Sequence, residues 1–361
     1  MDNVTRWVGL DEHLRQSAAA VIDTGTGEVT EHRIEGGAAQ VAAWLEGLPR
    51  PWRGVYEAGP TGYTLARRAA AAGLELEVCA PGHVRRRPGD RVKTDARDAR
   101  RLARLHAAGG LTLVAVPRVE DEQVRDLVRA REDVRADLMR ARHRLGTFLM
   151  RRELLYPGPG KAWTAAHRDW LSALRLGDRA SELTLADYLH AHDLLLARRA
   201  GLDAALAEIA EQCRFAPLIG RLRCLRGIQT LAALGLCAEV GDFGRFAHPD
   251  RLASYLGLVP SEASSGERRR QGAITKAGST HARRLLVEAA WHYRRPPRAS
   301  AALERRQRGQ EAWAGAGAWR AQRRLHRRWQ RLGAERGKQG GIVAVAVARE
   351  LSHFCWELAQ R

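Results

Sequence analysis

The sequence predicts an N-terminal α/β domain followed by two mainly helical regions. Three observations support this fold class. Short apolar segments typical of strands alternate with helical segments over the first third of the chain. The middle third has only helical apolar spacing, and the last third is again mostly helical. We therefore expect domains at residues 1–117, 118–215 and 216–361.

The first domain opens with a predicted three-stranded antiparallel meander. The turn between its second and third strands is Thr24-Gly25-Thr26-Gly27, a composition typical of tight turns. After the meander, helices and strands alternate. The predicted strands are 6–10, 17–23, 28–34, 54–57, 74–80 and 111–116, and the predicted helices are 37–48, 62–72 and 95–106.

A long amphipathic helix is predicted over residues 119–155, to be packed against another helix or chain. Pro157-Gly158-Pro159-Gly160 would break it, and a second helix at 183–209 would be its antiparallel partner. In the last region we expect the helical segments 222–236 with a turn at Gly227, 279–293 with Ser279 or Thr280 as the N-cap, and 342–358.

Composition excludes several classes of protein. Of the 361 residues 45% are hydrophobic, enough to bury a core, yet no run of about 18 apolar residues could span a membrane. The first residues lack a signal-peptide pattern. The 5 cysteines form no CxxC pair, which argues against a disulfide framework and a zinc site. We therefore expect a cytoplasmic protein.

The charge is strongly positive and unevenly distributed. The 60 Lys and Arg exceed the 41 Asp and Glu, which gives a formal charge of +19. Most of the excess lies in residues 261–340, and a smaller part lies in 82–106. Tryptophans are interleaved with the C-terminal arginines. This mixture favours nucleic acid as a partner, through phosphate neutralisation and stacking on bases.

Four carboxylates occupy positions that could converge at one edge of the predicted sheet. Asp11 follows the first strand, Glu57 ends a later one, and Asp95 and Asp98 share a face at the start of a helix. Converging carboxylates can bind two Mg²⁺ ions for phosphoryl chemistry. The alternative is structural: such residues also end strands, pair with arginines and cap helices.

Three stretches carry a resemblance to a known family. They are Tyr56-Glu57-Ala58-Gly59-Pro60-Thr61-Gly62, the segment from Arg87 to Ala99, and Tyr255-Leu256-Gly257-Leu258-Val259-Pro260-Ser261-Glu262 with Ser264-Ser265-Gly266 after it. The sequence resembles the insertion-sequence transposases of the IS110/IS116/IS902 type over nearly its whole length.

The resemblance implies an RNase H-like, RuvC-like first domain with Asp11, Glu57, Asp95 and Asp98 as its DEDD metal ligands. It implies that the middle helices form a coiled-coil dimerisation element. It also implies a catalytic serine in the last domain, which by position is Ser264, with its neighbour Ser265 as the alternative. Metal ions held by the carboxylates could activate the hydroxyl and stabilise the transferred phosphoryl group.

The resemblance further implies DNA strand exchange, with element ends and target DNA as substrates and a structured non-coding RNA as guide. The serine and the carboxylates would meet across a subunit interface, so a dimer or tetramer is expected, in a bacterial, nucleoid-associated protein without membrane contact. We expect phosphates to be bound by Arg85, Arg86, Arg87, Lys93, Arg268, Arg269, Arg270 and Lys276.

Two other functions remain open from the sequence. One is a RuvC-like, structure-specific nuclease in which the carboxylates hydrolyse DNA and Ser264 is structural. The other is a nucleic-acid-binding protein without enzymatic activity. His281 follows the serine in sequence and could shuttle a proton, but we expect it to be a surface residue at a helix start.

Overall fold

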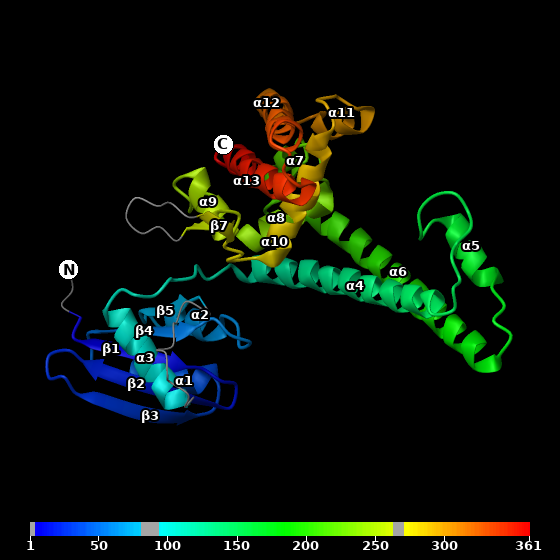
Figure 1. The fold of residues 1–361 in the computed structure, drawn as a ribbon. Coiled ribbons are helices and arrows are strands. Elements are labelled where there is room, and N and C mark those ends of the chain that lie inside the picture. The colour runs from blue at the N-terminus through cyan, green and yellow to red at the C-terminus, as the bar shows by residue number, and fades with distance from the viewer. Residues whose placement is uncertain (1–3, 81–93, 263–270) are drawn as a thin grey trace. The chain divides into compact units, whose positions relative to one another are not determined.

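The computed structural model describes residues 4–80, 94–262 and 271–361. The chain divides into two compact units, Met1–Arg118 and Val119–Arg361 (Figure 1). Among the described helices, none combines the length and the apolar composition that a bilayer span requires.

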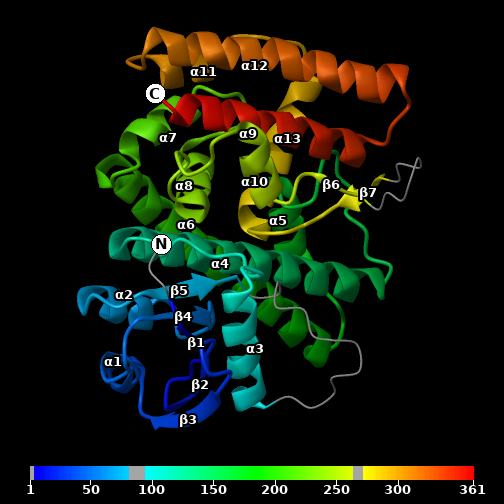
Figure 2. The ribbon, with the colours of Figure 1, turned by 90° about the vertical axis from the view of Figure 1, so that its left-hand side faces the viewer.

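Unit 1 is a mixed sheet with helices on both faces (Figure 2). Its described strands are ordered β3-β2-β1-β4-β5. The first three form the predicted antiparallel meander, and β1, β4 and β5 run parallel. The elements are β1 Arg6–Asp11, β2 Gln16–Asp23, β3 Val29–Glu35, α1 Ala38–Glu46, β4 Trp52–Glu57, α2 Thr64–Ala71, β5 Leu76–Cys79 and α3 Asp95–Ala107.

The predicted strand at 111–116 is wrong, because this segment forms only an isolated bridge between Leu113 and Cys79. Two backbone hydrogen bonds hold it beside β5, from Ala80 to Thr112 and from Val114 to Val78. The segment lies between Gly110 and a proline at 117, which has no N–H to extend a ladder.

The alternation of side chains along β1 assigns each face of the sheet to its helices. Val8 and Leu10 pack with residues of α1 and α2 in one hydrophobic cluster. Trp7 points to the other face, where its ring meets His106 of α3 edge-on. On that same face, Val55 of β4 packs with Leu102 of α3. Odd-numbered residues of β1 therefore face α3.

Gly9 is the point of closest approach between α3 and the sheet. A Cβ atom placed on Gly9 would lie 2.1 Å from the carbonyl oxygen of Ala99 and 2.5 Å from the amide nitrogen of Ala103. Both are backbone atoms, so no side chain could move aside. Only glycine lets α3 rest directly on β1 here.

The described part of unit 2 is helical apart from one small hairpin. Its elements are α4 Val119–Met150, α5 Ala165–Ala173, α6 Arg179–Gln212, α7 Ala216–Leu222, α8 Thr230–Val240, α9 Pro249–Tyr255, β6 Pro260–Glu262, β7 Gln271–Ile274, α10 Thr280–Ala290, α11 Ala301–Gln307, α12 Ala312–Gln330 and α13 Gly340–Ala359. A short 3₁₀ turn, Trp291–Arg294, follows α10, and a π turn, Arg331–Glu335, follows α12.

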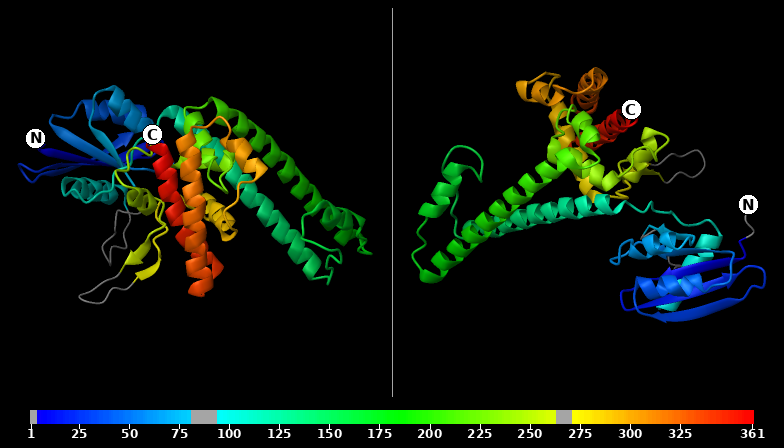
Figure 3. Two further views of the ribbon diagram at one scale, coloured as in Figure 1. Left: turned by 90° about the horizontal axis from the view of Figure 1, so that it is seen from above. Right: turned by 180° about the vertical axis from the view of Figure 1, so that it is seen from behind.

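Helices α4 and α6 pack against each other as an antiparallel pair within one chain (Figures 1 and 3). Arg131 of α4 pairs with Asp203 of α6 at 2.6 Å, and Leu145 packs near Leu185 and Leu189 farther along. The antiparallel partner expected for the long helix is therefore confirmed. The helix ends at Met150 rather than 155, because Glu153 adopts a left-handed φ of 56° and Leu154 bonds back to Leu149.

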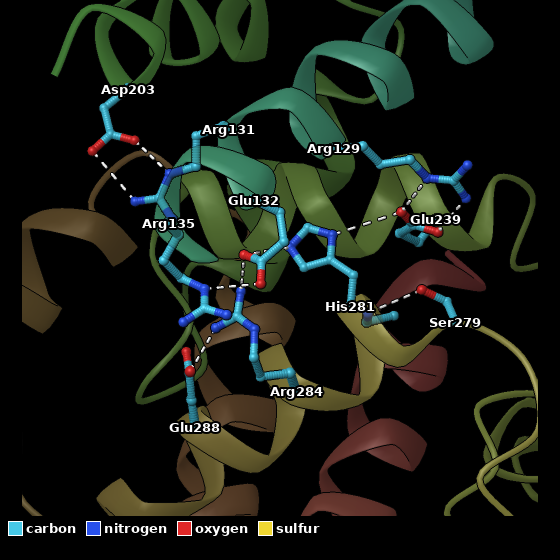
Figure 4. A network of polar contacts seen from close by, with 11 residues as sticks. Arg129, Arg131, Glu132, Arg135, Asp203, Glu239, Ser279, His281, Arg284 and Glu288 are labelled. Atoms are coloured by element: carbon cyan, nitrogen blue, oxygen red, sulfur yellow. Dashed lines mark hydrogen bonds and ion pairs between the residues drawn. The ribbon is translucent and has the colours of Figure 1, made fainter. Parts of the chain in front are cut away.

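A polar network joins α4, α8 and α10 (Figure 4). Arg129 of α4 makes a two-pronged pair with Glu239 of α8, at 3.0 and 3.1 Å. His281 of α10 lies between Glu239, at 3.6 Å, and Glu132 of α4, at 3.8 Å. The histidine side chain is only 14% exposed. The expectation of a surface residue is wrong, since α10 turns this face toward α4 and α8.

The charge balance of this network fixes the ionisation of its deepest member. The Glu239 side chain is 3% exposed. Burial alone would raise its pKa, but contacts with His281 and Arg129 outweigh burial and hold the pKa at about 2. Glu132 also binds Arg284 of α10. The network therefore connects α10 to α4 and α8 through paired charges.

We expect Gly9→Ala to destabilise the protein by roughly 3 kcal/mol, because the added methyl group pushes α3 off the sheet. Urea unfolding of the full chain, followed by circular dichroism, measures the change. Gly47→Ala is the matched control, because a Cβ at Gly47 lies 3.5 Å from its nearest neighbour and φ is −75°. Equal stability of the two variants would contradict the close approach.

We expect Glu239→Gln to cost about 2–4 kcal/mol at pH 7, because Arg129 loses its buried partner. The folded-state pKa lies below the ordinary 4.5. The ionised carboxylate therefore stabilises the fold above that value, and the benefit is lost as the pH falls toward 2. Urea unfolding at pH 7 and pH 3 should show a smaller difference from wild type in acid.

Glu288→Gln is the control for this network. Glu288 pairs with Arg284 but is 57% exposed, so its loss should change stability by less than about 0.5 kcal/mol. A Glu239→Gln variant as stable as this control, or one equally destabilised at both pH values, would contradict the assigned ionisation.

Candidate active site

Two of the four predicted carboxylates lie at equivalent ends of neighbouring parallel strands. The β1–β4 register pairs Leu10 with Tyr56, so Asp11 and Glu57 are next in line on adjacent strands. Asp11 lies two residues after Gly9, and Glu57 lies two residues after Val55. Gly9 and Val55 face α3, so side chains two residues farther along each strand point to the same side. The sheet therefore presents them on the face that α3 covers.

Helix α3 brings Asp95 to Asp11. Thr94 is the N-cap, and its hydroxyl accepts a hydrogen bond from the Arg97 amide at 3.4 Å. Asp95 is the first helical residue and is not needed as the cap. Its carboxylate, that of Asp11 and the His13 imidazole each place a ligand atom within 4.8 Å of the other two.

These donors fit a divalent cation. Two carboxylates supply the oxygen ligands that Mg²⁺ and Mn²⁺ favour. His13 was not anticipated from the sequence, although it stands only two residues after Asp11. Its ring is 55% exposed and lies 3.6 Å from the Asp11 carboxylate. An imidazole is a poorer ligand for Mg²⁺ than for transition metals.

The other two carboxylates lie outside this three-residue group. Asp98 is one turn farther along α3 and accepts a hydrogen bond from Arg101 at 2.8 Å. Glu57 is paired in register with Cys79 of β5. Burial raises the pKa of the Cys79 thiol to about 11, and the charge of Glu57 adds to the rise. Glu57 is therefore near Cys79 as well as beside Asp11.

The loop after β4 is held by two hydrogen bonds, one of them to the residue that follows Asp11. The Tyr56 hydroxyl donates to the Gly62 carbonyl at 3.2 Å, and the Thr61 hydroxyl donates to the Glu12 carboxylate. Burial raises the pKa of Glu12, although the bond from Thr61 acts against the rise. This glutamate, also missed from the sequence, connects the end of β1 to the loop.

The base of the β6–β7 hairpin is fixed by close backbone packing. Gly257 and Gly278 both have positive φ, and a Cβ on either would lie within 2.4 Å of opposing backbone. Arg283, which is 8% exposed, donates to the carbonyls of Leu256 and Ala277. Lys276 is also here, with a φ of 56° and its amide bonded to the Gly257 carbonyl.

The remaining predicted site residues lie outside the described residues. They are Arg85, Arg86, Arg87 and Lys93, between β5 and α3, and Ser264, Ser265, Arg268, Arg269 and Arg270, between β6 and β7. The described part of the hairpin pairs Pro260 with Ile274 and Glu262 with Gln271. The Ser261 hydroxyl donates to the Ala273 carbonyl at 2.9 Å.

The chain matches two transposase families. Residues 8–151 match DEDD transposases of the IS110 type, which implies a RuvC-like fold for this part, and residues 220–304 match the transposase IS116/IS110/IS902 family. A putative transposase, y4qE, of Sinorhizobium fredii is 39% identical over 98% of this chain and 88% of its own length. The transposase for insertion sequence element IS1533 of Leptospira borgpetersenii is 33% identical over 92% of this chain and 98% of its own length. The chain therefore belongs to the IS116/IS110/IS902 family of insertion-sequence transposases.

Proposed function

We propose that this transposase cleaves and rejoins DNA strands with a divalent-metal centre on unit 1 and a serine nucleophile on unit 2. The observation that carries the proposal is the convergence of Asp11 and Asp95 on the α3 face of the sheet. Glu57, next in line to Asp11, and Asp98, one turn after Asp95, would complete the DEDD ligand set. Asp98 would then exchange its contact with Arg101 for the metal.

The residues of the site have separate tasks in this proposal. Bound Mg²⁺, two ions in the full set, would supply positive charge to the scissile phosphate and acidify a nearby hydroxyl. The carboxylates hold those charges, and the α3–β1 contact keeps Asp95 beside Asp11. Lys276 and the arginines at 85–87 and 268–270 would bind flanking phosphates.

Ser264 would make the covalent bond. Its hydroxyl oxygen attacks the scissile phosphorus and gives up its proton, while the sugar oxygen on the other side leaves and gains one. A phosphoserine ester replaces the phosphodiester, so the energy of the broken bond is kept for rejoining. This retention suits strand exchange, which needs no other energy source, better than hydrolysis.

We also propose that the working unit is at least a dimer, with a structured non-coding RNA selecting the DNA sites. Apolar side chains on the outside of the α4–α6 pair support the dimer. Met139 and Met150 of α4 are 38% and 70% exposed, and Leu183 and Leu194 of α6 are 62% and 57% exposed. Each pair is eleven residues apart, about three helical turns, so its members share a face.

Asp11→Asn should abolish the rise in melting temperature that Mg²⁺ or Mn²⁺ produces in the wild type, because a charged ligand is lost. Strand cleavage should fall with it. Differential scanning calorimetry with and without metal gives a readout independent of activity.

Glu46→Gln, an exposed change on α1, is the control. His13→Ala should keep the Mg²⁺ response. Full metal response and recombination in Asp11→Asn would contradict the centre.

Ser264→Ala should lower strand cleavage by roughly a thousandfold or more and abolish the covalent protein–DNA adduct, since the nucleophile is gone. The measurement is denaturing electrophoresis of a labelled element end. Ser261→Ala is the control, because that hydroxyl is bonded to Ala273. An adduct lost only in Ser265→Ala would move the nucleophile by one residue. Metal-dependent cleavage by both Ser264→Ala and Ser265→Ala would instead identify a hydrolytic nuclease.

Mixing Ser264→Ala chains with Asp11→Asn chains tests the shared site. If serine and carboxylates of one site come from different subunits, a mixed dimer has one intact site and regains activity. If they come from the same chain, every site in the mixture lacks one group. Activity no higher than that of the separate variants would contradict the composite site.

A further inference from the structure

The C-terminal helices enclose a groove that the proposed chemistry does not use. Helices α12 and α13 run side by side (Figures 2 and 3). The groove formed by their side chains has a volume of about 650 Å³. Four arginines of α12 line it, together with Pro249 at the start of α9 and residues of α13. The arginines are Arg320, Arg323, Arg324 and Arg327.

The four arginines form one face of α12. Their spacing of three and four residues places them together, while Ala321, Leu325 and Trp329 of the same helix are buried. Two pairs, Arg320 with Arg324 and Arg323 with Arg327, are four residues apart. Like charges at this spacing repel and destabilise a helix by a few tenths of a kcal/mol.

Helix α13 neutralises one of these pairs and leaves the other. Glu357 pairs with Arg320, and Glu350 pairs with Arg324 at 2.9 Å. In the described ranges 4–80, 94–262 and 271–361, no carboxylate contacts the exposed Arg323 and Arg327. Along the helix their Cα atoms are roughly 6 Å apart. Two guanidinium groups are thus available to an anion with charges spaced along a line.

Helix α13 lines the opposite wall of the groove with Glu350, His353 and Glu357 and with two aromatic residues. Phe354 and Trp356 of α13 line it and are half-buried. The indole N–H of Trp356 donates to the Phe246 carbonyl at 2.8 Å, which fixes the ring. Apolar rings beside unpaired arginines are typical of sites for single-stranded nucleic acid, where sugars and bases contact the rings and phosphates meet the cations.

We propose that this groove between α12 and α13 binds the backbone of a single-stranded nucleic acid segment through Arg323 and Arg327. Its volume is in the range of small-ligand pockets, roughly 300–1,000 Å³, and is far too small for a duplex. The inference shares with the proposed function only the premise that the chain acts on nucleic acid. It adds a binding site made of residues other than the carboxylates and Ser264.

The test measures the affinity of the full-length protein for labelled single-stranded DNA and RNA of one sequence. Fluorescence anisotropy is recorded at several salt concentrations without divalent metal, so that no strand is cleaved. Arg323→Ala/Arg327→Ala should flatten the slope of log affinity against log salt by about 1.4. Affinity at low salt should fall tenfold or more for at least one of the two strands.

Arg144→Ala/Arg198→Ala is the matched control. Both arginines are exposed on the α4–α6 pair, and neither contacts a carboxylate in the described residues. This variant loses the same charge and should keep the wild-type slope. Glu357→Gln removes a competing anion from Arg320 and should tighten binding severalfold. Because the four replaced arginines are exposed, thermal melting of the two arginine variants should be unchanged.

The outcomes separate the groove from the proposed function. A loss confined to RNA or to DNA identifies the strand held there. Equal slopes for the groove variant and the control would overturn the inference. Neither result depends on Asp11 or Ser264, so the groove can fail while strand exchange stands, and the reverse.

Discussion

The contact of α3 with β1 at Gly9 is the constraint on which the candidate metal centre depends. The carboxylates come from three separate elements, and nothing local in the sequence holds them together. Asp11 ends β1, whereas Asp95 begins a helix more than eighty residues later. The helix reaches the strand because Ala99 and Ala103 rest against a residue without a side chain. The two carboxylates repel each other and cannot hold themselves together. Backbone packing of α3 on β1 therefore places the two ligands.

In unit 2, ion pairs rather than close backbone packing connect the helix that follows the β6–β7 hairpin to its neighbours. The segment after the β6–β7 hairpin runs into α10, and α10 is connected to α4 and α8 through His281, Arg284, Glu132 and Glu239. Behind the hairpin, Arg283 joins two turns of backbone through their carbonyls. Loss of one partner would leave a buried charge unpaired, so these ion pairs favour one position for the hairpin base. In unit 1 a glycine without a side chain positions the helix, whereas in unit 2 long cationic side chains position the hairpin base.

The sequence predicted most of unit 1 because period-two strands and short turns are local signals. The strand at 111–116 failed because ladder formation depends on the neighbouring β5 edge. In unit 2 the α4–α6 pair follows from helical spacing, whereas the tryptophans and arginines of α12 indicate a nucleic-acid partner but do not by themselves predict a helix. The first turns of its buried face hold small residues, Ala314, Gly317 and Ala318, and the large apolar residues Leu325 and Trp329 follow only later in the helix. His13 and Glu12 were missed because their roles depend on distances to Asp11 and Thr61 that only folding creates.

The strict alternation of β1 has a consequence for how chains with this fold can vary in length. Gly9 and Asp11 serve α3 only while they stay two residues apart on one side of the strand. An insertion or deletion of one residue inside β1 would turn either the glycine or the carboxylate to the helices on the opposite side. The β2–β3 turn at Thr24–Gly27 is exposed and lies at the far end of β2 from the Asp11–Ala18 pair. We therefore expect length changes to be tolerated at that turn and to disrupt the site within the first strand.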